Sequence, residues 1–365
     1  MEKLIILNIS SFLKSTSFVT TTIWAIIFVF ITTSILVSVY TFIVRYRRIK
    51  KDQKEKKLIE KFQEIFYDFL FSSEDNTALN TAIEKFKPYT KNKFDKSILL
   101  KTIHTIHQDV IGDIADKLKI LYVELELVTD SIKKMKSSRW HIQIKGMREL
   151  SDMKIKNVVK DIEVLTSHPN TILRKEAQLS LVKINGFKGL NFLNTLEYPL
   201  SEWQQLLLLE TVQWFKGKDI PRLENFLASK NHSVIIFTLK LIRVFSLINL
   251  KDALILLLYH ENEKIKTETI FVLGELYMKD QLTLLKSIYF KSTKRVQLKI
   301  IEFFEKVAGE EDVSFLIEQL KLYDYDINIQ LLRAIKSIEG KQKLEVLKGN
   351  LLPKQQELLL HVLEE

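Results

Sequence analysis

The amino-acid sequence predicts an all-α protein with a single N-terminal transmembrane helix, a helical neck and a C-terminal solenoid of stacked helix pairs. Three observations predict this fold. Residues 18–44 carry no charge, a cluster of Lys and Arg follows them directly, and apolar residues recur every 31 positions from about residue 141. The chain has only 9 Gly and 5 Pro among its 365 residues, so few positions favour the end of a helix.

The uncharged stretch has the length of a membrane-spanning helix. As a helix, residues 18–44 would be about 40 Å long, and tilting would fit them into a hydrocarbon core about 30 Å thick. Trp24 and Tyr40 lie near its two ends, where aromatic rings favour the membrane interface. A buried soluble helix of this length and composition is rare. A cleaved signal peptide is the stronger alternative, but its apolar core is only about 7–15 residues long, and no small-x-small cleavage site precedes the basic cluster.

The basic residues beside this stretch predict its orientation. Residues 45–61 carry nine Lys and Arg against three Asp and Glu, which accounts for six of the net +10 charge of the chain. The cations nearest to the membrane surface are Arg45, Arg47, Arg48, Lys50 and Lys51. Since positive loops stay in the cytoplasm, we expect residues 1–17 outside the inner membrane and the chain after residue 44 in the cytoplasm. A membrane therefore explains the basic charge better than a nucleic acid does.

Ser34 and Ser38 lie one helical turn apart within the uncharged stretch. Small residues at this spacing allow two membrane helices to approach closely, so these two form a candidate contact with another membrane helix. The alternative is that the hydroxyl groups of this Ser- and Thr-rich stretch bond to carbonyls of their own helix.

Residues 45–136 predict a basic juxtamembrane helix and a helical neck without a clear repeat. Apolar residues recur at helical spacing on one face of the first helix, at Leu58, Phe62, Ile65, Phe66, Phe69 and Leu70. Three interpretations are open for this face: it packs on the next helices, it pairs with a second copy of the chain, or it lies on the bilayer.

Residues 137–365 predict about seven helix pairs that share one core. Four apolar series recur at the 31-residue period, which places two helices in each unit. One series begins the second helix: Ile172, Trp203, Val234, Ile265, Val296, Ile327 and Leu358. Another follows five residues later: Ala177, Leu208, Leu239, Ile270, Ile301 and Leu332. The other two lie on the first helix and include Leu223, Leu227, Leu254 and Leu258. Neither helix can bury its apolar face alone, so successive pairs must stack.

The second helix of several units resembles that of HEAT repeats. Residues 170–181 (NTILRKEAQLSL) and 263–276 (EKIKTETIFVLGEL) carry this likeness, which covers residues 140–365. The whole layout is similar to membrane-anchored bacterial HEAT-repeat proteins, through LSEWQQL at residues 200–206 and IPRLENFLAS at residues 220–229. That resemblance implies an association with membrane glycosyltransferases of polysaccharide assembly, and it supplies no catalytic residue. The Asp and Arg usual in the HEAT turn are missing around Trp203 and Val296.

The sequence offers no candidate for a catalytic residue, a cofactor or a metal site, so we expect a protein that is not an enzyme. It has no cysteine, which excludes a disulfide, a thiolate metal site and a cysteine nucleophile. No glycine-rich phosphate loop and no His-Glu-x-x-His motif occurs. Among the seven His residues, only His104 and His107 can share a helix face, and a solvated polar surface explains them. The alternative is a lyase or transferase that uses the concave groove of the solenoid.

We expect a protein partner on the second helices, which line the concave side of such stacks. Four apolar residues exceed what one core stripe needs: Leu206, Trp214, Ile236 and Phe237. Basic residues recur on these helices and would suit an acidic partner: Arg174, Lys175, Lys240 and Arg243. The alternative is that the central helices are covered on more sides. The leading hypothesis is a scaffold that docks a protein partner at the cytoplasmic face of the inner membrane; another alternative is a self-associating structural membrane protein.

Overall fold

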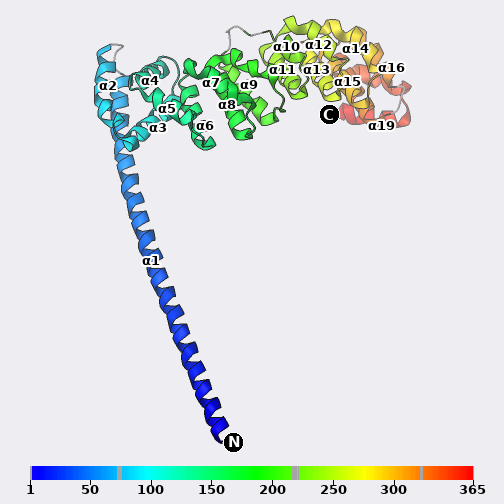
Figure 1. Cartoon of the computed structure of the whole chain (residues 1–365). Coiled ribbons are helices and arrows are strands. Elements are labelled where there is room, and N and C mark those ends of the chain that lie inside the picture. Colours follow the sequence, from blue (N-terminus) through cyan, green and yellow to red (C-terminus); the bar gives the residue numbers. More distant parts are fainter. Residues whose placement is uncertain (1, 72–75, 216–219, 221, 321–323, 365) are drawn as a thin grey trace. The chain divides into compact units, whose positions relative to one another are not determined.

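The computed structural model describes residues 2–71, 76–215, 220, 222–320 and 324–364, with side chains from Thr20 onward except at residues 76 and 350. Within these ranges every regular element is an α-helix or a 3-10 helix, which confirms the predicted all-α class (Figure 1). The chain divides into two compact units, unit 1 (Met1–Thr129) and unit 2 (Asp130–Glu365).

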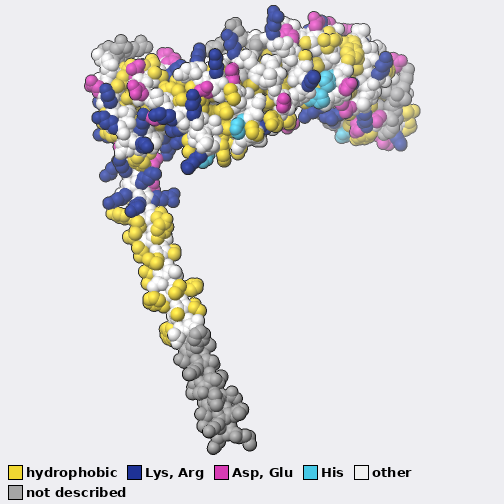
Figure 2. Space-filling view, viewed as in Figure 1, with side chains coloured by type: hydrophobic (Ala, Val, Ile, Leu, Met, Phe, Trp, Pro, Cys, Tyr) yellow, Lys and Arg dark blue, Asp and Glu magenta, His cyan; other side chains and the backbone are white. Residues whose placement is uncertain are grey.

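Unit 1 begins with one long helix, α1 (Glu2–Leu70), of 69 residues. At 1.5 Å per residue, this helix is roughly 100 Å long. Its segment from Thr20 is long and apolar enough to cross a membrane: the mean hydropathy is 2.3, and 0% of the apolar window is buried. Figure 2 shows apolar side chains along this segment and a band of Lys and Arg next to it. A helix long and apolar enough to cross a membrane is thus confirmed, although it continues beyond the predicted bounds of residues 18–44, while insertion and orientation stay predictions.

The side chains predicted to meet the membrane or another helix are exposed on α1. Trp24 is 71% exposed and Tyr40 is 69% exposed. The hydroxyl of Thr33 donates to the carbonyl four residues earlier at 2.8 Å, so part of this stretch satisfies its hydroxyls within its own helix. Ser34 and Ser38 are exposed as well, and their contact with a second helix stays a prediction.

Three further helices form the neck: α2 (Asn76–Thr90), α3 (Lys93–Asp109) and α4 (Asp113–Glu124). The rings of Phe62 and Phe66 on α1 are buried and lie 5.7 and 4.7 Å from the ring of Phe86 on α2. All six residues of the predicted apolar face, from Leu58 to Leu70, are buried. The prediction that this face packs on the next helices is therefore confirmed. Its two alternatives, pairing with a second copy and contact with the bilayer, are wrong for these six residues because their side chains are covered within unit 1.

Unit 2 is a stack of helix pairs. The long helices are α6 (Trp140–Asp152), α8 (Thr171–Asn185), α9 (Glu202–Gln213), α11 (His232–Phe245), α13 (Glu263–Glu275), α15 (Lys294–Val307), α17 (Tyr325–Glu339) and α19 (Pro353–Glu364). The short ones are α7 (Val159–Glu163), the 3-10 helix η3 (Gly186–Thr195), α10 (Glu224–Leu227), α12 (Lys251–Leu257), α14 (Leu282–Tyr289), α16 (Val313–Gln319) and α18 (Lys341–Leu347). Consecutive long helices pack on one another, and each short helix packs on the long helix that follows it (Figure 1). This arrangement is an α-solenoid. The helix α5 (Leu127–Met135) contains the boundary between the units.

The predicted period identifies the core of this stack. The series Ala177, Leu208, Leu239, Ile270, Ile301 and Leu332 is buried in every unit, with at most 1% exposure at each position. The series that begins the second helix is buried at Val234, Ile265 and Val296. The predicted burial is wrong for Ile172 and Trp203, which are both exposed.

The N-caps of the long helices explain this difference. They lie at Asn170, Ser201, Asn231, Asn262, Thr293 and Asp324, spaced by 31 residues except for a step of 30 between Ser201 and Asn231. Trp203 lies two residues after its cap, whereas Val234 lies three residues after its own. Because of the 30-residue step, a position in the 31-residue series shifts by one residue relative to the N-cap of its helix. This shift rotates its side chain by about 100° around the helix axis. That position therefore faces solvent before the step and the core after it.

Leu258→Asp should disrupt the solenoid, because it buries an unpaired carboxylate at a cost of several kcal/mol. Leu258 is 2% exposed, whereas Leu256, two residues earlier, is 74% exposed. Leu256→Asp is the matched control and should unfold like the parent protein in a thermal melt followed by circular dichroism. Equal melting of the two variants would show that the register is wrong.

Acid should loosen α17 from α15 through Asp324. This residue caps α17 by accepting from the N–H of Ile327 at 3.2 Å, and it pairs with Lys294 of α15 at 2.8 Å. The hydrogen bond from Lys294 lowers the pKa of Asp324. The carboxylate thus contributes stability above its unfolded-state pKa, and this stability is lost as the pH falls below about 4 and through the lowered folded-state pKa.

Hydrogen exchange of α17 as a function of pH measures this effect, which is small because both side chains are partly exposed. Asp324→Asn keeps a capping oxygen but no ionisable group, so its exchange should lose the acid dependence of the parent protein. If the variant keeps that dependence, another group is responsible.

Candidate functional site

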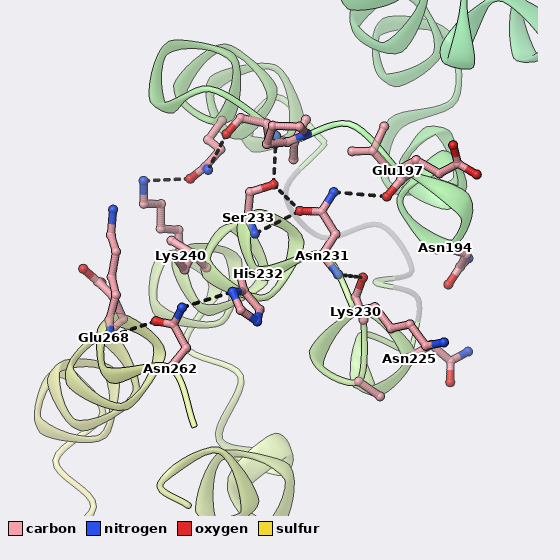
Figure 3. A pocket seen from close by; sticks show the side chains of 18 of the residues that line it. Asn194, Glu197, Asn225, Lys230, Asn231, His232, Ser233, Lys240, Asn262 and Glu268 are labelled. Carbon is pink, nitrogen blue, oxygen red and sulfur yellow. Dashed lines mark hydrogen bonds between the residues drawn. The ribbon is translucent and has the colours of Figure 1, made fainter. Parts of the chain in front are cut away.

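An open groove of about 1210 Å³ lies where the linker between η3 and α9 meets the first turns of α11 and α13 (Figure 3). The linker residues 196–201 have no helix of their own. Side chains of α9, α11 and α13 complete the walls, and most of the groups that line the groove are polar or charged. The groove therefore lies at a junction of the described stack that contains an irregular linker.

Asn231 fixes the linker to α11. Its amide nitrogen donates to the carbonyls of Leu196 and Tyr198 at 3.1 and 3.0 Å. Its Oδ1 accepts from the N–H of Ser233 at 3.1 Å, which caps α11. The hydroxyl of Ser233 in turn accepts from the N–H of Leu200 at 2.8 Å. Backbone groups without a regular partner are thus satisfied by the first turn of the next helix.

Asn262 has a similar role at the other wall (Figure 3). It caps α13 by accepting from the N–H of Lys264 at 2.9 Å, and its Nδ2 lies 3.0 Å from Nδ1 of His232. Nδ1 of His260 accepts from the N–H of Asn262 at 2.9 Å, and the two imidazole rings lie 5.3 Å apart, edge to face. Both imidazoles therefore support the cap. In the part of the chain that the structure describes, no three His, Asp or Glu residues are placed to hold a metal ion.

The charges in the groove are balanced between Lys230, Lys240, Lys264, Glu197, Glu202 and Glu268. Lys240 donates to Gln205 at 2.9 Å. The hydroxyl of Ser233 donates to Asn231 at 2.7 Å and not to a base, so it is not arranged as a nucleophile. The groove thus offers amides and charges of both signs for hydrogen bonding.

The predicted apolar contact residues fall into two groups. Leu206 and Trp214 are exposed, at 53% and 75%, as the sequence suggested. Phe237 is completely buried, and Ile236 is 9% exposed at the wall of the groove. The prediction of a partner contact is wrong for Phe237, because α9, α10 and α13 all pack on its helix. The burial of Phe237 fits the alternative expectation, namely that neighbouring helices cover the central helices on more sides.

The predicted basic residues also differ from one another. Arg174 is buried: it donates to two carbonyls of the preceding turn, and its guanidinium lies 3.8 Å from the ring centroid of Tyr198. Its prediction as a contact for an acidic partner is therefore wrong, because its charge is used inside the solenoid. Lys175, Lys240 and Arg243 are partly exposed, and of these Lys240 lines the groove.

Sequence reasoning missed Trp203 and the two asparagines. Trp203 was assigned to the core, yet it is 68% exposed on α9, three residues before Leu206. The signal that identifies it is Ser201, a capping residue placed one position later in the register than Asn231 and Asn262.

No protein-family model matches the chain, and no curated protein matches it. Among solved structures, an engineered protein is similar, with 13% identity and a TM-score of 0.33 over 85% of this chain and 99% of that one. Kap121p is similar with 14% identity and a TM-score of 0.33 over 80% of this chain, which spans 35% of the Kap121p chain. At these scores neither likeness carries an argument about function, and the α-solenoid assignment rests on the stacked helix pairs.

Asn231→Ala should release the linker wall of the groove, because it removes a helix cap and two hydrogen bonds to backbone carbonyls. We expect a local loss of about 2–3 kcal/mol. Amide exchange should accelerate at residues 196–198, at residue 200 and in the first turn of α11. Asn225, exposed on α10, lines the same groove, and Asn225→Ala is the matched control with unchanged exchange. Identical exchange in the two variants would contradict the role of Asn231.

Proposed function

We propose that this protein is a membrane-anchored, non-enzymatic scaffold of HEAT type, whose unit 2 docks a protein partner at the cytoplasmic face of the inner membrane. The uncharged segment of α1 is the anchor, with residues 1–17 outside and the basic cluster inside, as the positive-inside rule requires. The helical-repeat fold supports the proposal, because solenoids present long continuous surfaces that suit protein binding.

The observation that carries the proposal is the composition of α9. Glu202 and Gln205 contribute polar groups to the groove, while Trp203 and Leu206 expose apolar surface on an adjoining face of the same helix. A large aromatic side chain next to satisfied polar groups is typical of the centre of a protein interface. A monomeric surface has little reason to expose such residues one turn apart.

The hydrogen bonds in the groove support binding over catalysis. Asn231, Ser233 and Asn262 bond to the backbone or to one another, and Nδ1 of His260 accepts a backbone N–H. Groups paired in this way fix the shape of a surface, whereas a general base must be free to take a proton. We therefore retain the non-enzymatic proposal.

The partner that we propose is a component of a membrane glycosyltransferase system for envelope polysaccharide, following the resemblance to membrane-anchored bacterial HEAT-repeat proteins. The balanced charges of the groove favour a partner segment with residues of both signs. The strongly acidic partner first suggested by the basic residues is disfavoured, because Arg174 is buried.

A photo-crosslinking amino acid in place of Leu206 should yield one adduct with that partner in intact membranes. The same amino acid in place of Leu256, which is also exposed but lies on α12, should not. Trp203→Ala should lower the recovered partner roughly tenfold, as expected for an aromatic interface residue. Adducts of equal yield at both positions, or recovery unaffected by Trp203→Ala, would argue against this surface.

A further inference from the structure

We infer that the turn between α2 and α3 is a second membrane contact of unit 1, a surface for the headgroups of anionic phospholipids. The inference rests on the proposed insertion of α1 and adds a contact that the anchor alone does not supply. It concerns residues 90–93, which follow α2 and begin α3.

Contacts with α1 fix the height of this turn, which is its distance along α1 from the end of the uncharged stretch. The ring of Phe94 lies 5.3 Å from Nζ of Lys51 and 5.2 Å from Nζ of Lys54, and Lys54 pairs with Asp95 at 2.7 Å. The start of α3 thus lies beside residues 51–54 of α1. Residue 51 follows the end of the uncharged stretch by seven positions, about 10 Å along the helix. The headgroup layer extends about 5–8 Å beyond the hydrocarbon, so a lysine side chain at this height reaches it.

The end of α2 lies farther from the uncharged stretch. The ring of Tyr89 is 5.0 Å from that of Phe62, and Nζ of Lys61 is 5.5 Å from the centroid of Tyr89. Between Tyr89 and Phe94 the chain therefore runs roughly 12 Å along α1 toward the uncharged stretch. Asn92 caps α3 by accepting from the N–H of Phe94 at 2.8 Å, which fixes the conformation of the turn where α3 begins.

The cations at this end of unit 1 have no carboxylate partner among the described residues, although Lys50 and Lys51 lie over the rings of Tyr46 and Phe94. Lys91 and Lys93 are exposed and form no ion pair among the described residues. The same is true of the membrane-surface residues of α1, namely Arg45, Arg47, Arg48, Lys50 and Lys51. Some cations elsewhere in unit 1 form ion pairs, as Lys85 does with Asp68 at 3.2 Å. Figure 2 shows this band of Lys and Arg where the apolar segment ends.

Anionic phospholipid is the partner that this geometry favours. With α1 inserted, seven cations that form no ion pair, from two separate segments, lie at the height of the headgroups, and cations there are attracted to an anionic bilayer surface. A nucleic acid would also bind such cations, but an inserted α1 would hold them against the bilayer. Binding of nucleic acid is therefore an outcome of the test and not part of the proposal.

The chain has no cysteine, so single reporters can be placed in the full-length protein. Three variants carry a nitroxide label: Thr90→Cys at the turn, Asn80→Cys farther up α2, and Ser34→Cys in the uncharged stretch. Each is reconstituted in nanodiscs of phosphatidylcholine, with or without phosphatidylglycerol. A nickel-chelating lipid then reports proximity to the headgroups. We expect strong relaxation at Thr90 that rises with phosphatidylglycerol, weak relaxation at Asn80, and a hydrocarbon environment at Ser34.

The outcomes separate the two proposals. A Ser34 label outside the hydrocarbon would overturn the anchor and with it the proposed function. A Ser34 label inside the hydrocarbon, with equal relaxation at Thr90 and Asn80, would overturn only the lipid contact.

Charge removal tests the lysines themselves. In the Thr90→Cys background, Lys91→Gln should reduce the response to phosphatidylglycerol roughly fivefold, whereas the paired Lys85→Gln should leave it unchanged. Loss of the response in millimolar inorganic phosphate at constant ionic strength would indicate a free-phosphate site. Displacement of the turn from the nanodisc by duplex DNA would indicate a nucleic-acid surface. Either result overturns the proposal.

Discussion

No helix pair of unit 2 can bury its apolar face by itself, and the rest of the unit depends on this constraint. Leu239, Ile270 and Ile301 are each buried between elements of successive pairs, so one core runs through the stack. The stability of each pair is therefore partly that of its neighbours. Surface features such as the groove depend on how two successive helix pairs pack, because the core forms at the junction between pairs and not within a single helix.

The periodic part of the fold was predictable because apolar residues at a fixed spacing have a direct physical meaning. Leu208 and Leu332 are far apart in sequence and equally buried, as one shared core requires. The exposure of Trp203 was not predictable from hydrophobicity, because a step of one residue changes the direction of a side chain without changing composition. The spacing of the N-caps reveals that step, but only when the residues at which the helices begin are known.

The candidate site was only partly accessible to sequence reasoning. Leu206 was correctly assigned to the surface, whereas Phe237 was not, because a sequence pattern does not show how many neighbours cover a helix. Arg174 illustrates the same gap for charges: its guanidinium satisfies backbone carbonyls of the turn before it. Asn231 was missed for the opposite reason, since a single amide in a polar turn gives no hint of bonds to a linker more than 30 residues earlier.

The short step between Ser201 and Asn231 has a consequence for recognition. A perfectly periodic rod offers a partner the same surface at every unit, so that the partner has no preferred position and slides from one unit to the next. A junction that differs from its neighbours gives the rod a distinct binding position. In this protein that junction contains the groove and lies next to the exposed Trp203, so a partner that recognised both would bind at one place and in one direction along the repeat.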